Sequence, residues 1–389
     1  MDHLRVGFFT EIFRPVVNGV VESVDALAVD LRSRGHEVYC FAPSMPGAKE
    51  HDGPVFRMPS LPLPTRTPYR LTLPLVSRRN VNNIIKRLSL IHVHSPFVTG
   101  WLGVRYARRY GVPVVYTYHT HLEAYAHYVP FEPRATRFAA SQLTRTFGNL
   151  VDAVVVPTPA MAKHLRDIGV EARIEIVPSG IDVRTFGAGV RDEKLRRRVG
   201  VRAGERLILL VSRLAREKNV KLLLHALAIA NEPSLKLVIA GDGPMREELQ
   251  EGAKTLGVAE QTMFLGVVAR EQLPDLYASA DAFVFPSTSE TQGLVQAEAL
   301  AAGSYVIAAD SGPNGEVLAG AGLIVAARAD AFAAALAQTP RGPSEDQIRR
   351  AKSAAERFSI SRQSDRILEL YMSLLEPQPD GLRRMRDSA

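Results

Sequence analysis

The stretch from Asp281 to Gly303 constrains the fold of this chain more than any other. It begins with a mostly apolar run that ends at Phe285, which predicts a strand buried on both faces, as in a parallel sheet. A polar loop follows, and the residues from Leu294 to Ala302 predict a short packed helix that ends at Gly303. Strand, polar loop and helix in this order place ligands at the carboxyl edge of an open α/β sheet. The sequence therefore predicts an α/β protein with a binding site after this strand.

Two carboxylates flank the start of the predicted helix. Glu290 lies in the loop, and Glu298 lies in the helix among alanines and a leucine. The helix start offers free N–H groups at Thr291 to Leu294, which suit a diphosphate or a sugar hydroxyl. In one interpretation the helix dipole favours Glu290 by about 0.3–1 kcal/mol and Glu298 is solvated. In the other, Glu298 needs a hydrogen-bonding partner on so apolar a helix, and ribose hydroxyls would provide one.

Composition limits the class of protein. The chain has 389 residues, a length that is sufficient for two domains. Its content of 46% hydrophobic and 23% charged residues indicates a globular protein. No run of about 18 apolar residues predicts a transmembrane helix. The single cysteine, Cys40, and an N-terminus without a signal-peptide core predict a cytosolic protein. The net charge of +7 fits nucleic acid, an anionic substrate or an anionic lipid surface, or an arginine-rich proteome.

The first part of the chain predicts a β–α–β opening. Strands at Leu4–Phe9 and Glu37–Phe41 flank a helix at Val20–Arg34, which indicates a parallel sheet. The fingerprint G-x-G-x-x-G is absent after the first strand, which argues against a nicotinamide enzyme. Residues 54–75 are rich in proline and basic residues, so interior helix or strand is not expected there.

Gly19 and His119 are candidate site residues in this part. Gly19 permits close backbone approach at a helix start and thus an anion site, although a turn glycine is the simpler reading. The strand Val114–Tyr118 delivers His119 and His121 to its carboxyl end. The two histidines lack helical metal-ligand spacing, and we find neither a third ligand cluster nor an Asp-x-Asp pair, so no metal is expected.

Two segments mix basic and apolar residues. Residues 78–90 predict a helix with basic and apolar sides, and residues 134–150 contain arginines, phenylalanines and leucines without an acid. One reading is that these segments rest on an anionic bilayer. The other is that they are packing faces with solvated arginines.

The second part of the chain starts a new series of strands. Arg206–Val211 predicts a strand, and Arg213 and Lys218 lie in the loop between it and a helix at Val220–Ala230. Two cations at such a junction could clamp a diphosphate, or they could be a solvated loop. The strand Leu235–Ala240 then ends in Gly-Asp-Gly-Pro, which predicts a tight turn.

These residues resemble a known family. Glu290 and Glu298, separated by seven residues and followed by Ala-Leu-Ala-Ala-Gly, resemble the E-x7-E motif of family 4 glycosyltransferases. The segment Ser-Glu-Thr-Gln-Gly-Leu-Val is similar to the corresponding segment in the branch of the family that contains diacylglycerol glucosyltransferases. The resemblance covers nearly the whole chain. It implies a retaining enzyme of the GT-B fold, an α/β architecture with two doubly wound Rossmann-like parallel-sheet domains facing across a cleft.

The resemblance also implies domain limits. Residues 1–183 would form an N-terminal acceptor-binding domain, and residues 184–361 a sugar-nucleotide-binding domain. A helix at about 362–376 would cross back to the first domain, and residues 377–389 would be a disordered tail.

Residue roles follow from the same resemblance. His119 and Glu290 would be catalytic, and Asn18, Tyr125 and Tyr128 would lie on the acceptor side. The expected donor-binding residues are Gly19, Arg213, Lys218, Gly241, Gly243, Val267, Glu290, Thr291, Gln292, Gly293, Leu294 and Glu298.

The expected reaction moves glucose or galactose from UDP-glucose or UDP-galactose to a membrane lipid such as diacylglycerol. It needs no obligatory cofactor, and the enzyme would be peripheral on the inner face of the cell membrane, held through regions 78–90 and 134–150. No nucleic-acid partner is expected, because no motif with interleaved aromatics is present. The alternatives are a GDP-mannose-dependent mannosyltransferase acting on a phosphoinositide or glycolipid, a sugar-nucleotide epimerase, and a non-catalytic nucleotide-binding protein.

Overall fold

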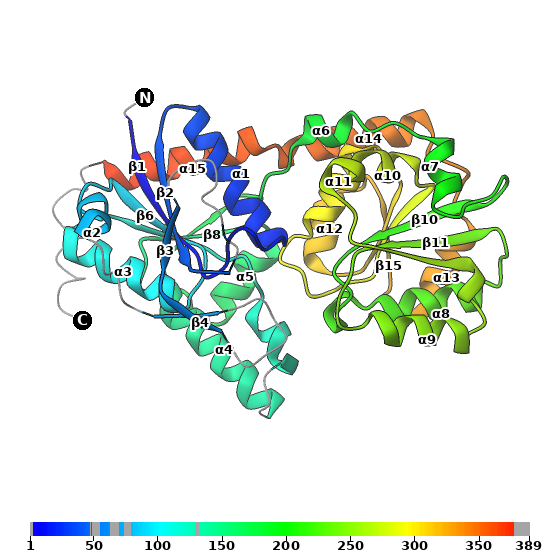
Figure 1. Cartoon of the computed structure of the whole chain (residues 1–389), viewed down its shortest axis with the longest axis horizontal. Coiled ribbons are helices and arrows are strands. Elements are labelled where there is room, and N and C mark those ends of the chain that lie inside the picture. Colours follow the sequence, from blue (N-terminus) through cyan, green and yellow to red (C-terminus); the bar gives the residue numbers. More distant parts are fainter. Residues whose placement is uncertain are drawn as a thin grey trace.

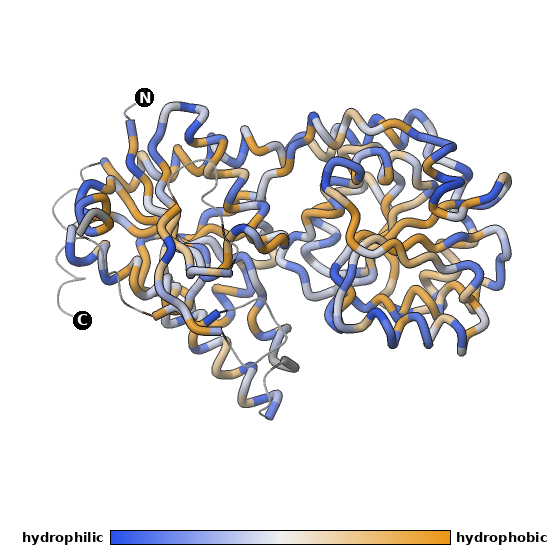
Figure 2. Tube along the Cα trace, viewed as in Figure 1, coloured by the Kyte–Doolittle hydropathy of each residue, from blue (hydrophilic) through white to orange (hydrophobic). Residues whose placement is uncertain are grey.

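Two parallel β-sheets organise the chain into two domains (Figure 1). The computed structural model describes residues 3–46, 48, 55–62, 70–73, 79–128 and 132–376, with the backbone alone at 79–80 and 126–128. Helices cover the sheets, and in both domains hydrophobic residues concentrate along the strands (Figure 2). The predicted α/β architecture with two doubly wound Rossmann-like domains is confirmed.

The N-terminal domain has a seven-stranded parallel sheet of order β3-β2-β1-β6-β7-β8-β9. The strand order reverses beside β1, which pairs with β2 and β6. The strands are β1 (Arg5–Phe9), β2 (Glu37–Pro43), β3 (Val55–Met58), β6 (Leu90–Val93), β7 (Val114–Thr117), β8 (Ala153–Val156) and β9 (Arg173–Ile176). The helices are α1 (Gly19–Ser33), α2 (Arg79–Ile85), α3 (Val98–Tyr110), the 3-10 helix η1 (Leu122–Tyr128), α4 (Pro133–Gly148) and α5 (Pro159–Asp167).

The proline-rich segment contains more regular structure than the sequence predicts. β3 adds a parallel edge strand to β2, and β4 (Ser60–Pro62) pairs with β5 (Arg70–Thr72) in a small antiparallel sheet. The prediction excluded interior strands, and these strands lie instead at a sheet edge or in a two-stranded sheet, with the prolines outside β3 and at the end of β4. An edge strand also has one side on which no ladder hydrogen bond is needed. Residues 63–69 and 74–78 lie outside the described residues.

The C-terminal domain has a six-stranded parallel sheet of order β12-β11-β10-β13-β14-β15. Its strands are β10 (Arg206–Val211), β11 (Leu235–Ala240), β12 (Thr262–Gly266), β13 (Ala282–Phe285), β14 (Val306–Ala309) and β15 (Leu323–Val325). The helices from its start to its sixth strand are α6 (Val183–Gly187), α7 (Glu193–Arg198), η2 (Arg216–Lys218), α8 (Val220–Ala230), α9 (Arg246–Thr255), η3 (Ala259–Gln261), η4 (Arg270–Gln272), α10 (Leu273–Ser279), α11 (Leu294–Ala301) and α12 (Gly312–Leu318). After β15 come α13 (Ala329–Ala337), α14 (Glu345–Ala355) and η5 (Glu356–Phe358).

The last helix, α15 (Ile360–Leu375), packs on the N-terminal domain. The chain passes to it beside the earlier domain connection, where Ile181 N donates to Phe358 O and Ile360 N donates to Ile181 O. Ile367 and Tyr371 are fully buried in the core that α1 and β1 also line. Figure 1 shows α15 lying along the N-terminal domain near α1. The two domains are therefore joined by two adjacent crossings.

The two basic-apolar segments differ in what they expose. In α2 and the residues after it, Val81, Ile85 and Leu88 are buried in the N-terminal core. These three apolar side chains are therefore packed inside the domain, in agreement with the alternative reading of a packing face, and membrane contact by this segment stays a prediction. In α4, by contrast, Phe138 is 67% exposed. Within the described part of the chain, no helix has both the length and the apolar character needed to cross a bilayer.

Candidate active site

Glu290 lies where the strand order of the second sheet reverses. β10 sits between β11 and β13, so the loops after β10 and β13 leave the same sheet edge as neighbours. Lys218 Nζ, from the first loop, donates to Glu290 Oε1 at 2.5 Å, and Ser287 Oγ donates to the same oxygen at 2.9 Å. Lys218 is 18% exposed and Glu290 16%. Arg213 lies exposed in the loop of Lys218, so the fold brings two expected cations and one expected carboxylate to one sheet edge.

Gly241 and Gly243 let the loop after β11 pack against the loop after β10. At Gly241 φ is +133°, and a Cβ would lie 1.9 Å from the Ser212 carbonyl oxygen. At Gly243 a Cβ would lie 2.4 Å from the Leu214 carbonyl oxygen. A side chain at either position would separate the two loops. These glycines therefore shape the wall beside Arg213, as expected for a position of close backbone approach.

Helix α11 starts at Leu294, as the sequence predicts, but the free N–H groups at its start are not those expected. Gly293 is its N-cap at φ +84°, and Leu294 is its first residue. Gln296 N already donates to Gly293 O, so the earliest helical N–H groups are those of Leu294 and Val295. The expected N–H cluster at Thr291 to Leu294 needs this correction, because Thr291 and Gln292 still belong to the loop.

Thr291 and Gln292 connect this loop to the N-terminal domain. Thr291 Oγ1 donates to the His119 carbonyl oxygen at 3.0 Å, and its own carbonyl accepts from Thr158 Oγ1 at 3.0 Å. The Gln292 side chain bonds both backbone groups of Ser179, at 2.8 and 3.0 Å. These two side chains are therefore engaged in positioning the loop against the N-terminal domain.

Glu298 is 4% exposed and has two side-chain partners. Tyr277 Oη donates to Oε2 at 3.0 Å, and Arg270 Nη1 donates to Oε1 at 3.3 Å. Burial raises the pKa of Glu298, while Arg270 and the Tyr277 hydrogen bond oppose that rise. Arg270 Nε also lies 3.6 Å from Glu22 Oε2 in α1, so this arginine joins Glu298 to the other domain. The solvated reading of Glu298 is wrong.

Two buried side-chain amides, those of Gln296 and Asn314, connect α11 to α12. Gln296 Nε2 donates to Asn314 Oδ1 at 2.9 Å. Asn314 Nδ2 donates to the carbonyls of Ser287 and Ala309, at 2.9 and 2.8 Å. Both amides are fully buried. Asn314 thus holds the first residues of the Glu290 loop against β14, a role that sequence reasoning missed.

His119 is held by a second histidine. Its Nε2 lies 3.0 Å from His94 Nδ1, at the end of β6. His92, two residues earlier, contacts Tyr371 Oη and Thr117 Oγ1, both at 2.6 Å. Burial lowers the pKa of His119 to about 4 and that of His92 to about 3. His119 is therefore a neutral hydrogen-bonding group at pH 7, and the sequence analysis missed His94 as its partner.

The remaining expected residues surround these two centres. Gly19 begins α1 and faces the other domain, where a Cβ on it would lie 3.7 Å from Leu294 Cδ1. Asn18 caps α1 by accepting from Val21 N at 2.9 Å. Tyr125 is half-buried in η1, and Val267 is 81% exposed after β12. The side chain of Tyr128 lies outside the described residues.

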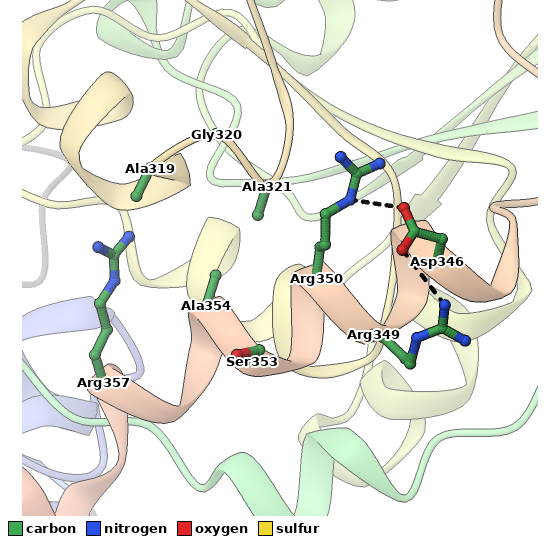
Figure 3. Close-up of a pocket in the computed structure, with 9 residues that line it drawn as sticks. All are labelled: Ala319, Gly320, Ala321, Asp346, Arg349, Arg350, Ser353, Ala354 and Arg357. Atoms are coloured by element: carbon green, nitrogen blue, oxygen red, sulfur yellow. Dashed lines mark hydrogen bonds and ion pairs between the residues drawn. The ribbon is translucent and has the colours of Figure 1, made fainter.

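A separate groove of about 480 Å³ lies away from these residues (Figure 3). It runs between the end of α12 and α14. Two of its arginines, Arg349 and Arg350, pair with Asp346 at 3.4 and 3.1 Å. None of the expected site residues lines it, and its charges are partly neutralised. The chemistry points instead to the interdomain region around Glu290, Glu298 and His119.

That region has the parts that glycosyl transfer needs. Lys218, Arg213 and the start of α11 can stabilise a departing diphosphate, as fixed positive charges do for developing anions. Glu290 can accept hydrogen bonds from sugar hydroxyls. Glu298 can accept hydrogen bonds from ribose hydroxyls, either beside Arg270 or after Arg270 has moved away from the carboxylate. Neutral His119 adds a donor or acceptor from the opposite domain.

Comparisons with known proteins agree with this reading. Residues 17–185 match Glycosyltransferase Family 4 and residues 191–357 match Glycosyl transferases group 1. The chain is 34% identical over 312 residues to an alpha-monoglucosyldiacylglycerol synthase of Streptococcus pneumoniae, covering 78% of this chain and 71% of that protein. It is 35% identical over 323 residues to a GDP-mannose-dependent alpha-mannosyltransferase of Mycobacterium tuberculosis, covering 80% of each.

A solved structure extends the likeness in fold. The crystal structure of Anabaena HepE in complex with UDP-glucose superposes with a TM-score of 0.74 at 21% identity, over 95% of this chain and all of that one. At this identity the likeness establishes the fold alone. Together with the matches in sequence, it identifies the chain as a member of the family 4 glycosyltransferases, with the GT-B fold.

Proposed function

We propose that this enzyme transfers a hexose, glucose or galactose, from a UDP-sugar to a membrane lipid such as diacylglycerol. The UDP-sugar part of this proposal is supported by one observation: Lys218 contacts Glu290 where the strand order of the second sheet reverses. The lipid half is supported by the 34% identity to an alpha-monoglucosyldiacylglycerol synthase. The alternative of a non-catalytic nucleotide-binding protein is disfavoured because both glutamates and both cations of the expected site are present.

In the proposed reaction, the bond between the anomeric carbon and the diphosphate oxygen breaks, and a bond to the acceptor hydroxyl oxygen forms. The electron pair of the broken bond leaves with the diphosphate, which Arg213, Lys218 and the start of α11 stabilise. A phosphate oxygen takes the acceptor proton. Glu290 holds the sugar hydroxyls and favours the cationic anomeric centre. Retention of configuration follows from the leaving and attacking groups sharing one face.

His119 would act as a neutral hydrogen-bonding group on the donor sugar. Because burial lowers its pKa to about 4, it stays uncharged at pH 7 and does not compete with Lys218 for the phosphates. Its contact with His94 fixes the ring, which a positioning role requires. Closure of the two domains would exclude water that otherwise hydrolyses the donor.

Helix α4 is the proposed membrane contact. Arg134, Arg137 and Arg145 are exposed along it together with Phe138, which is 67% exposed. Figure 1 shows α4 extending away from the sheet of the N-terminal domain. Basic and aromatic groups on one exposed helix suit an anionic bilayer surface. We therefore place the enzyme peripherally at a membrane, with the acceptor lipid entering near η1.

A second candidate uses GDP-mannose. It is favoured by the 35% identity to a GDP-mannose-dependent alpha-mannosyltransferase over 80% of the chain, close to the identity with the glucosyl-lipid synthase. A mannosyl group would need the same diphosphate contacts, and its acceptor would be a phosphoinositide or a glycolipid. The two candidates therefore differ in the base and the sugar, not in the roles of Lys218 and Glu290.

A donor screen by mass spectrometry tests the proposal. Purified enzyme is incubated with UDP-glucose, UDP-galactose or GDP-mannose, with and without diacylglycerol in anionic vesicles. A hexosyl-diacylglycerol from a UDP-sugar is expected. Mannosylated lipid from GDP-mannose would favour the second candidate, and an isomerised sugar nucleotide without acceptor would identify an epimerase. Hydrolysis of the donor without any lipid product would contradict the proposal that the acceptor is a lipid.

A further inference from the structure

Three metal-ligand side chains meet outside the donor site, in the N-terminal domain. They are His121, just before η1, Glu123 in η1, and His164 on α5. One ligand atom from each lies within 4.8 Å of the others. Sequence analysis expected no metal because it examined His119 and His121 as a pair, and His164 joins the group only through the packing of α5 against η1.

The geometry of the group is that of a site open to an ion. His121 Nε2 lies 3.6 Å from Glu123 Oε2, and His164 Nε2 lies 3.4 Å from Glu123 Oε1. The two imidazole rings are 4.6 Å apart at an interplanar angle of 60°. A zinc ion with bonds of about 2.0–2.2 Å in tetrahedral geometry separates its ligand atoms by roughly 3.3–3.6 Å. The two nitrogen–oxygen separations, one to each oxygen of the Glu123 carboxylate, are close to that range.

His164 supplies an independent observation. Its Nε2 is buried and has no hydrogen-bond partner among the residues that the structure describes. It lies 3.4 Å from Glu123 Oε1, within the distance of an ion pair with a protonated ring, but this contact does not meet hydrogen-bond geometry. A buried ring nitrogen without a partner is costly, and a metal ion between the ring and the carboxylate would satisfy it.

Glu123 also has the outer contacts that orient a metal-binding carboxylate. Ser141 Oγ, from α4, donates to Oε1 at 2.9 Å, and Tyr118 Oη, at the end of β7, donates to Oε2 at 3.3 Å. Glu123 is 9% exposed, whereas His121 is 26% exposed. Outer partners of this kind fix ligand orientation, and the exposed edge at His121 gives an ion a way in.

We propose that His121, Glu123 and His164 bind one divalent transition-metal ion of the zinc class. Two imidazoles and one carboxylate suit such an ion better than magnesium or calcium, which prefer oxygen ligands. With three protein ligands, the fourth position is open to water. The ion would link η1 to α5, and so brace the segment that follows His119 and contains Tyr125. This inference rests on the N-terminal domain and does not depend on the donor or acceptor.

The test measures binding of Zn²⁺ and Co²⁺ to the full-length chain, without a histidine tag and freed of metal by a chelator. Titration against a chromophoric chelator should give one zinc ion per chain, and Co²⁺ should give the strong visible absorption of a four-coordinate site. His121→Gln and His164→Gln should each weaken zinc binding at least about tenfold. His225→Gln, at an exposed position on α8, is the matched control and should leave binding unchanged.

Circular dichroism checks that each variant is folded. If His164→Gln does not fold, Ser141→Ala provides a second test, because this variant keeps all three metal ligands. It should weaken zinc binding by about tenfold through the loosened carboxylate. Absence of stoichiometric zinc binding to the parent chain would overturn the proposal. Unchanged affinity in folded His121→Gln or His164→Gln would do so as well, since the ion would then bind elsewhere.

Discussion

Replacing Glu298 with glutamine should weaken donor binding and raise stability at neutral pH. If Glu298 accepts hydrogen bonds from the ribose, Glu298→Gln removes a charged acceptor. Hydrogen bonds to charged groups contribute about 1.5–3 kcal/mol, which corresponds to a loss of about 10- to 150-fold in UDP affinity. Isothermal titration calorimetry with UDP measures this directly and needs no knowledge of the acceptor.

The stability effect has the opposite sign because the folded protein buries this carboxylate. The pKa of Glu298 is raised above its ordinary value of 4.5, with burial as the largest cause. The folded state therefore holds a proton that the unfolded chain has lost, and parent stability falls as pH rises from 4.5 through the folded pKa. The gain in stability of Glu298→Gln over the parent should therefore be absent below this pH range and fully present above it.

The size of the gain follows from the partners. Tyr277 can still donate to the glutamine oxygen, and Arg270, which is 42% exposed, returns to water, so its lost pairing costs about 0–1 kcal/mol. Active-site groups are often held at a cost in stability, and stabilising substitutions commonly contribute about 0.5–2 kcal/mol, which is the gain we expect here. Urea unfolding at several pH values measures this difference. The exposed neighbour Glu271→Gln is the control for loss of one negative charge.

Two results would refute this reasoning. Unchanged UDP affinity in Glu298→Gln would exclude the ribose role. A variant less stable than the parent at pH 8 would mean that the pairing with Arg270 and Tyr277 outweighs the cost of burial, so that Glu298 is mainly a structural ion-pair partner.

Three further predictions concern catalysis and membrane contact. Glu290→Gln should lower the transfer rate by about 10²–10³-fold by weakening charge stabilisation, while circular dichroism remains unchanged; a parent-like rate would remove its catalytic role. His94→Phe should lower the transfer rate about 2- to 12-fold through the lost His119 contact, with UDP affinity preserved, and equal losses in rate and affinity would contradict a positioning role. Phe138→Asp should reduce binding to anionic vesicles in sedimentation assays by about tenfold or more, whereas Phe138→Leu should retain most of it; equal binding by both variants would exclude α4 as the membrane contact.

The fold was predictable where a pattern is continuous along the chain. The apolar run before Glu290 is β13, buried at every residue, and the helix predicted at Val220–Ala230 is α8 with the same limits. Such elements are set by local periodicity and by burial on both faces of a parallel sheet. The strand β3 was missed because a short edge strand among prolines has almost no local signature.

The site was predictable to the extent that its residues follow strands. Glu290, Lys218 and His119 each lie just after a strand, and the parallel sheets bring such positions to one edge. The contacts of Arg270 with Glu298, of Asn314 with Ser287 and of His94 with His119 were missed, because they form only through tertiary packing. For His94 a signal did exist, since His92 and His94 lie two residues apart and therefore on one face of β6.

The Glu290 loop is tied to the connections between the two domains, and we propose a reason for this arrangement. Lys218 holds Glu290 itself, while Gln292 is bonded to Ser179, close to the point where Gly180 N donates to the Gln363 side chain. These last bonds lie in the two adjacent crossings between the domains, and connections of this kind are where hinges for domain closure lie. Anchoring the loop to the crossings would keep Glu290 in place against the proposed diphosphate site during domain closure. Domain motion would then change access for water and acceptor without disturbing the charges that we propose to stabilise the transition state.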